Sequence, residues 1–331
     1  MATQWLRRAW LVAAFASAAL LAACGGGDNI ESKFVPERVV AFGDAEGDVG
    51  QTGGRYTVND NTVNIWTQIV AAAYGKTLTA QSAGGLGFAT GNARIVLEPD
   101  AGGSTATMTV REQVDTFLAS NTFGANDLVL VSAGTSDIIV QAKAALDGTI
   151  SDAQALANVD QAARDLALQV RRMVDAGARH VVIAGVRNLA ITPWALAAGP
   201  TGGDLLQRLS SVSARTDQNQ PRAFNDRLKI ELADLGNSVL YVETASYFMQ
   251  VVANPGGNAL DNVTGVACTS VDAGAGIGTG TGQVNSRNCT PSTLQAGIDY
   301  GRWLFADRVY FTPRGQQLLG DLVSTRVRER W

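Results

Sequence analysis

The stretch Val39-Val40-Ala41-Phe42-Gly43-Asp44-Ala45-Glu46-Gly47-Asp48 decides how the rest of the chain is interpreted. Its first four residues are apolar, as expected for a strand that is buried on both faces of a parallel sheet. Gly43 and Asp44 then end the strand in a turn that carries two more acids. Ligands of open α/β sheets bind where strands end, so we predict that Gly43, Asp44, Glu46 and Asp48 line a pocket.

Strands and helices alternate after this stretch. Apolar runs predict strands, while apolar residues at helical spacing, with capping signals such as Thr109 before Glu112 and Ser151 before Gln154, predict helices. The expected strands are 39–42, 127–132, 180–184 and 238–242, and the expected helices are 64–74, 109–118, 151–176, 221–235 and a closing helix from 313. This order predicts the α/β class, a three-layer α/β/α sandwich with a central parallel sheet, similar to flavodoxin.

Four further segments are ordered like the conserved blocks of a known family. A glycine-rich loop at 80–94 contains Gly91, the strand at 127–132 runs into Gly134-Thr135-Ser136-Asp137, and Asn188-Leu189-Ala190-Ile191-Thr192-Pro193 follows the next strand. Near the end stands Asp307-Arg308-Val309-Tyr310-Phe311-Thr312-Pro313. Together with the first turn, these blocks resemble the GDSL, or SGNH, esterases and lipases, and the resemblance implies that family's three-layer fold.

The resemblance assigns catalytic positions, but the chemistry at three of them is changed. Ala45 stands where the family has its nucleophilic serine, Ser136 where it has asparagine, and Tyr310 where it has histidine. Gly91, which the resemblance implies as an oxyanion donor, and Asp307 are in place. A tyrosine with a pKa of about 10 is no base at neutral pH, and alanine offers no nucleophile.

The chain's single histidine does not repair this loss. His180 stands at the start of a predicted strand, on the edge of the sheet opposite the pocket, so a structural role is expected for it. We therefore predict an inactive member of the family that binds an acyl or carboxylate ligand, or a partner, in the old pocket. Two alternatives stay open: an active ester hydrolase built around Glu46 and Asp307, and an envelope interaction protein with a vestigial pocket.

The first residues have the form of an export signal. Arg7 and Arg8 precede an apolar run that ends Leu21-Ala22-Ala23-Cys24, which resembles the bacterial lipobox. We expect residues 1–23 to be a lipoprotein signal peptide, Cys24 to be lipidated, 24–36 to be a flexible tether, and 37–331 to be the domain. The predicted location is the cell envelope, anchored to the outer membrane and facing the periplasm or the surface.

Composition narrows the range of partners. The 331 residues are 46% hydrophobic and 17% charged, with a formal net charge of −4, which suits one globular α/β domain and gives no basic face for nucleic acid. No cofactor and no metal site are expected, because the acids near Asp44 lack metal-ligand spacing. The expected partners are an acyl or carboxylate small molecule or an envelope glycan or lipid, and the protein is expected to be a monomer.

Two cysteines remain after Cys24, and an exported chain makes their pairing the default. Cys268 and Cys289 are therefore predicted to form a disulfide. The glycine-rich run at 273–282 between them has no periodicity, so we expect the segment 254–300 to be a surface excursion held by this bond.

Overall fold

The computed structural model describes residues 34–211 and 220–331. One compact unit spans Phe34–Trp331, so it begins three residues before the predicted boundary at residue 37. Phe34 lies in the expected tether, but its ring stacks on His180 with centroids 3.9 Å apart, which makes it part of the domain. The predicted signal peptide, Cys24 and most of the predicted tether lie outside the described residues. Within the described ranges, no helix combines the length and apolar character needed to cross a bilayer.

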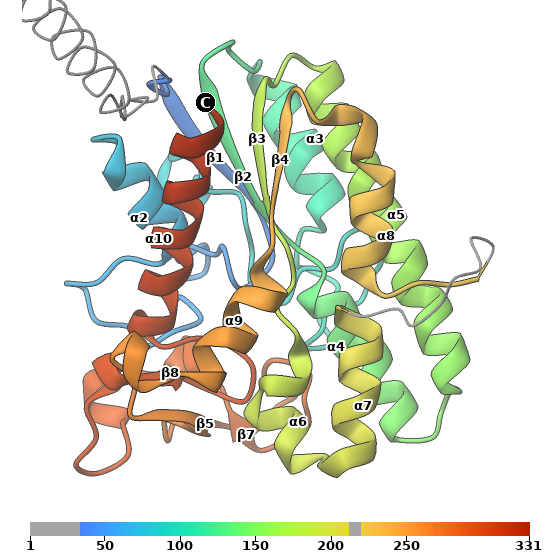
Figure 1. Ribbon diagram of the computed structural model, residues 1–331, viewed down its shortest axis with the longest axis vertical. Coiled ribbons are helices and arrows are strands. Elements are labelled where there is room, and N and C mark those ends of the chain that lie inside the picture. The colour runs from blue at the N-terminus through green and yellow to red at the C-terminus, as the bar shows by residue number, and fades with distance from the viewer. Residues whose placement is uncertain (1–33, 212–219) are drawn as a thin grey trace, which may run out of the picture. The chain divides into compact units, whose positions relative to one another are not determined.

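A four-stranded parallel sheet forms the centre of the unit (Figure 1). The strands are β1 (Arg38–Gly43), β2 (Asp127–Ser132), β3 (His180–Ala184) and β4 (Val239–Val242), and they are paired in this order. All three pairings are parallel, with Val40 opposite Val129 and Val129 opposite Val181. The predicted α/β class with a central parallel sheet is confirmed.

Helices cover both faces of this sheet. The α-helices are α2 (Trp66–Ala73), α3 (Val110–Ser120), α4 (Thr135–Leu146), α5 (Asp152–Asp175), α6 (Pro193–Ala197), α7 (Gly199–Ser210), α8 (Phe224–Glu231), α9 (Thr244–Ala253) and α10 (Pro313–Arg330). The Thr109 and Ser151 caps form as predicted, and Thr312 caps α10 with Pro313 in the first turn. The helix expected at 221–235 is α8 alone, followed by a short 3₁₀ turn at Ala233–Leu235.

Alternation along each strand separates two hydrophobic cores. Val40 and Phe42 of β1 face the core that contains α3, α4, α5, α7 and α8, whereas Val39 and Ala41 face the core that contains α2, α9 and α10. Successive side chains of a strand point to opposite faces, so a strand that is apolar at every position is buried on both sides. This explains why the first stretch is continuously apolar rather than alternating.

The segments beyond the carboxyl ends of the strands gather at the lower end in Figure 1. Here β5 (Asn262–Val266) pairs with β8 (Trp303–Phe305), and β6 (Val271–Asp272) pairs with β7 (Gln283–Val284). The Cys268–Cys289 disulfide is present, with Cα atoms 5.9 Å apart, and both residues are buried.

The glycine-rich segment is not merely a surface excursion, so that prediction is wrong in part. Ile277 is buried and belongs to the core that contains α4 and α5. Gly278 beside it packs so closely that an added Cβ would lie 2.4 Å from the carbonyl oxygen of Ala101. Ile277 is the one large apolar residue in this run, so it produces no periodic pattern in the sequence. Its burial is nevertheless enough to attach the loop to the core.

Candidate functional site

Ala45 follows β1 directly and is buried, with 1% of its surface exposed. The turn that holds it is organised by Asp44, whose Oδ1 accepts the Glu46 amide and whose Oδ2 accepts the Ser136 amide, each at 3.3 Å. Asp44 thus bonds one amide of its own turn and one amide in the first turn of α4. Burial raises the pKa of Asp44 to about 7, although the Ser136 amide and the charge of Arg187 act against that rise.

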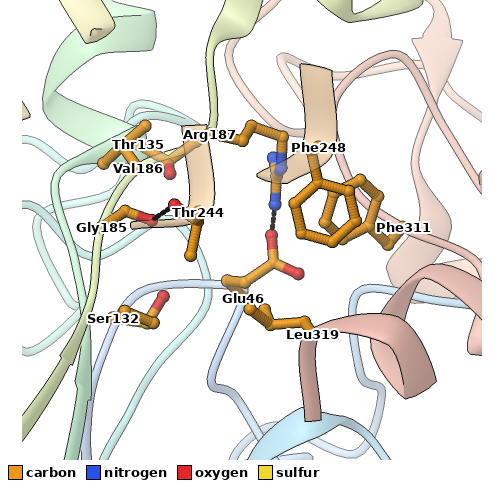
Figure 2. A pocket seen from close by; sticks show the side chains of 11 residues that line it. Glu46, Ser132, Thr135, Gly185, Val186, Arg187, Thr244, Phe248, Phe311 and Leu319 are labelled. Atoms are coloured by element: carbon orange, nitrogen blue, oxygen red, sulfur yellow. Dashed lines mark hydrogen bonds and ion pairs between the residues drawn. The ribbon is translucent and has the colours of Figure 1, made fainter. Parts of the chain in front are cut away.

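Glu46, the second acid of this turn, is held by contacts within the protein. It is buried and forms an ion pair with Arg187, which follows β3, and its Oε1 accepts a hydrogen bond of 2.8 Å from Gln316 of α10. Arg187 also donates to the Val309 carbonyl at 3.0 Å, and its guanidinium lies 4.1 Å from the centroid of the Phe311 ring. Figure 2 shows the carboxylate and the guanidinium facing each other at the centre of the site.

Tyr310 fills the place that the resemblance assigns to histidine. Its ring is fully buried, 5.9 Å from the Arg187 guanidinium and edge-on to Tyr56 at 5.3 Å. The pKa of its hydroxyl is raised well above the usual value, mainly by burial and then by the charges of Asp44 and Asp307. Neither this hydroxyl nor that of Ser136 has a hydrogen-bond partner in the part of the chain that the structure describes.

Asp307 keeps its position but has another task. Its carboxylate accepts the amides of Ser286, Val309 and Tyr310 at 3.0, 2.8 and 2.7 Å, as well as the Ser286 hydroxyl. Burial raises its pKa, and these hydrogen bonds act in the opposite direction. The carboxylate that orients an imidazole in the catalytic triad here holds two loops together.

The expected oxyanion donor is already engaged. The Gly91 amide donates to Asp48 Oδ2 at 2.8 Å, while Asp48 Oδ1 accepts the amides of Gly50 and Gln51, also at 2.8 Å. The ring of Tyr56 packs directly on Gly91, because an added Cβ would lie 2.0 Å from its Cε2 atom. The carboxylate of Asp48 therefore already accepts the Gly91 amide, which would have to be free to bind the oxyanion of a tetrahedral intermediate.

Little space remains beside the ion pair. The cavity next to Glu46 and Arg187 measures about 10 Å³, and Phe248, Phe311 and Leu319 line it (Figure 2). A single water needs about 10–15 Å³, so no acyl chain fits here without rearrangement. Of the predicted pocket residues, Glu46 lines this cavity, whereas Gly43, Asp44 and Asp48 are buried in the same turn and do not line it.

The sequence analysis missed Arg187 and Tyr56. Both are far from the first turn in the chain, so no local pattern connects them to it. A charged residue directly after the buried strand β3 is the one signal that could have drawn attention to Arg187. In contrast, His180 lies as predicted at the start of β3, between the rings of Phe34 and Trp331, at the opposite end of the sheet from Ala45.

No metal centre is evident at the site. Across residues 34–211 and 220–331, no group of three or more histidine, cysteine, aspartate or glutamate side chains is arranged to hold an ion. The neighbouring acids near Ala45 are instead occupied by amides and by Arg187.

The chain forms a three-layer sandwich around a parallel sheet. A Gly-Asp turn follows β1, and an Asp-x-x-x-x-Thr-Pro segment precedes the last helix. These features are typical of the class of α/β hydrolytic folds whose site lies at the ends of the strands. The family described as GDSL-like Lipase/Acylhydrolase matches residues 39–323, and the chain belongs to that family. No curated protein matches the chain.

Proposed function

We propose that this chain is a non-catalytic member of the GDSL family, exported and held to the cell envelope by lipidated Cys24, that binds a ligand without hydrolysing it. One observation carries the proposal: Ala45, at the nucleophile's position, is buried, and the neighbouring Glu46 is paired with Arg187 beside a cavity that has space for about one water. Ester hydrolysis by this fold needs a nucleophile, a base and free oxyanion donors.

The alternative of an active hydrolase built on Glu46 and Asp307 is less well supported. Glu46 is neutralised by Arg187, and Asp307 accepts four hydrogen bonds from Ser286, Val309 and Tyr310. A carboxylate nucleophile needs a free lone pair and access to the substrate, and both groups are buried.

The test of catalysis is hydrolysis of p-nitrophenyl acetate, butyrate and laurate by the purified chain. We expect turnover close to background, because removal of a triad as a unit leaves at most about 10³–10⁴-fold over the uncatalysed rate, and loss of an oxyanion donor removes about 10²–10³ of that. The matched control is Asp307→Ala, which should give the same background. Turnover that persists through repurification and is lost in Asp307→Ala would refute the proposal.

The test of anchoring is membrane fractionation of the Cys24→Ser variant. The proposal rests on Arg7, Arg8 and the Leu21-Ala22-Ala23-Cys24 motif. Several acyl chains hold a protein to a membrane where one chain does so only marginally, so loss of Cys24 should release the chain or leave it unprocessed. Cys268→Ser is the control that removes another cysteine. Unchanged processing and fractionation of Cys24→Ser would contradict the anchor.

A further inference from the structure

An open cleft lies on the other side of Tyr56 from the filled catalytic centre. It has a volume of about 390 Å³ and includes Gly91 in its wall. We call it the Gly91 cleft and define it by the six side chains that carry the argument: Tyr56, Asn92, Asp100, Asp272, Asn285 and Arg287. We propose that the Gly91 cleft binds a neutral oligosaccharide. This inference rests on the proposed function, because it names the ligand class of a non-catalytic protein.

Three segments that are distant in sequence form the cleft, and hydrogen bonds fix them to one another. Asn92 Nδ2 donates to the Gly276 carbonyl at 2.8 Å, and Arg287 Nε donates to Thr52 Oγ1 at 3.1 Å. Gly102 sits so close that an added Cβ would lie 2.9 Å from the Gly276 carbonyl oxygen. The walls are thereby preorganised, which reduces the entropy lost when a ligand binds.

The polar side chains of the cleft are held in place by the protein but keep bonding capacity. Asp100 accepts the Ser104 amide at 2.8 Å and the Thr107 hydroxyl at 2.6 Å, while Asp272 accepts Asn285 Nδ2 at 2.9 Å. A carboxylate has about four lone-pair sites, so each retains acceptors for a ligand. Each sugar hydroxyl is both a donor and an acceptor, which matches a wall of carboxylates, an amide and a guanidinium.

The charges of the cleft disfavour anionic ligands. Two carboxylates, Asp100 and Asp272, line it together with one guanidinium, Arg287, which is already bonded to the Thr52 side chain and carbonyl. An anionic ligand would therefore meet a wall of net negative charge. The described residues contain no cluster suited to a metal ion. A polar, uncharged ligand with many hydroxyl groups is the class that these groups accommodate.

The test measures binding of cellotriose, maltotriose and triacetylchitotriose to the purified full-length chain, by saturation-transfer NMR and calorimetry, with trigalacturonic acid as the anionic probe. At least one neutral trisaccharide should bind, and trigalacturonic acid should bind at least about tenfold more weakly, a difference of about 1.4 kcal/mol. No saturation transfer to any neutral trisaccharide, or tighter binding of the anionic one, would overturn the inference.

Two pairs of variants locate the binding. Ser104→Trp places a large side chain at an exposed position in the Gly91 cleft, and Thr281→Trp does the same in the neighbouring cleft near Lys143 and Thr149. Only Ser104→Trp should abolish binding. Asp272→Asn, which keeps the shape of the side chain, should weaken binding about tenfold, whereas Asp147→Asn should not change it. Binding that survives both Ser104→Trp and Asp272→Asn in folded protein would contradict the assignment.

Failure of this inference is distinguishable from failure of the proposed function. Trisaccharide binding together with ester hydrolysis would refute the non-catalytic proposal and leave the cleft assignment standing. Absence of both binding and hydrolysis would refute the cleft assignment alone.

Discussion

The filled centre around the Glu46–Arg187 pair and the Gly91 cleft meet at Tyr56, whose ring packs on Tyr310 and also lines the cleft, yet the two regions differ in packing. At the ion pair the side chains are buried, and the cavity beside them measures about 10 Å³. In the cleft, polar groups face an open volume of about 390 Å³. The comparison teaches that the changed positions Ala45 and Tyr310 go together with dense packing in the centre, while the neighbouring cleft stays open.

The largest expected effect concerns the Glu46–Arg187 pair at the heart of the filled centre. Glu46→Ala leaves a buried guanidinium unpaired, so the free energy of unfolding in urea should fall by about 3–5 kcal/mol. The double variant Glu46→Gln with Arg187→Met removes both charges and should recover much of that loss.

A solvent-exposed ion pair provides the control. Arg302 and Asp261 are paired at the surface, where solvent screens the interaction, so Asp261→Ala should cost far less than Glu46→Ala. Should Glu46→Ala cost no more than Asp261→Ala, the centre would be solvated rather than filled, and the contrast between the two regions would disappear.

The pH dependence of stability is the next largest effect. The unfolded chain releases the Asp44 proton near the ordinary pKa of 3.8, whereas the folded protein retains it up to about pH 7. The folded state thus binds more protons in this window, so this group lowers the free energy of unfolding as pH rises, by up to about 4 kcal/mol. Asp44→Asn removes that dependence. The midpoint temperature of unfolding of Asp44→Asn, relative to that of wild type, should therefore increase as the pH is raised from 4.5 to 8.

Asp261 is the control for Asp44. The hydrogen bond from Arg302 lowers the pKa of Asp261 below the ordinary 3.8, so the stability that Asp261 contributes is fully present above pH 3.8 and is lost only as pH falls through the folded pKa. Relative to wild type, Asp261→Asn should therefore show no upward trend between pH 4.5 and pH 8. The same trend in both variants would mean that Asp44 is not held as a buried acid.

A smaller effect is expected at Tyr310. Its hydroxyl is buried without a partner among the described residues, so Tyr310→Phe should raise the free energy of unfolding by about 1 kcal/mol. Tyr300 is the matched control, because its hydroxyl donates to Asp60 at 2.6 Å and Tyr300→Phe should destabilise the protein. Thermal unfolding of both variants gives the comparison. Destabilisation by Tyr310→Phe would reveal a polar partner in the centre, such as a bound water.

The strands and helices of this molecule can be predicted from the sequence more easily than the contacts within its site. The apolar run from Val39 to Phe42 predicts a strand that is buried on both faces. Such a run can be recognised from neighbouring residues alone. The capping residues Thr109 and Ser151 are equally local, and their helices begin as expected. The changed positions Ala45, Ser136 and Tyr310 could likewise be recognised from the order of the blocks.

The filling of the site could not be predicted, because it depends on contacts between distant segments. Arg187 meets Glu46 only when the ends of β1 and β3 share one edge of the sheet, and Asp48 meets Gly91 only when the glycine-rich loop folds back over the turn. The acids Glu46 and Asp48, which suggest a pocket in the sequence, are bonded to these partners instead. Residue identity shows which family residues are replaced, but not which side chains pack against the new ones.

The most direct test of the central claim is the rate of p-nitrophenyl acetate hydrolysis by the single variant Ala45→Ser. This change restores a hydroxyl at the nucleophile's position and nothing else. We predict background hydrolysis, because an unactivated serine is a weak nucleophile, no imidazole lies near it, and the Gly91 amide is bonded to Asp48. The smallest set with a prospect of activity adds Tyr310→His and Ser136→Asn. Turnover by Ala45→Ser alone would show that a base and an accessible site exist, and it would contradict the account of a filled, non-catalytic centre.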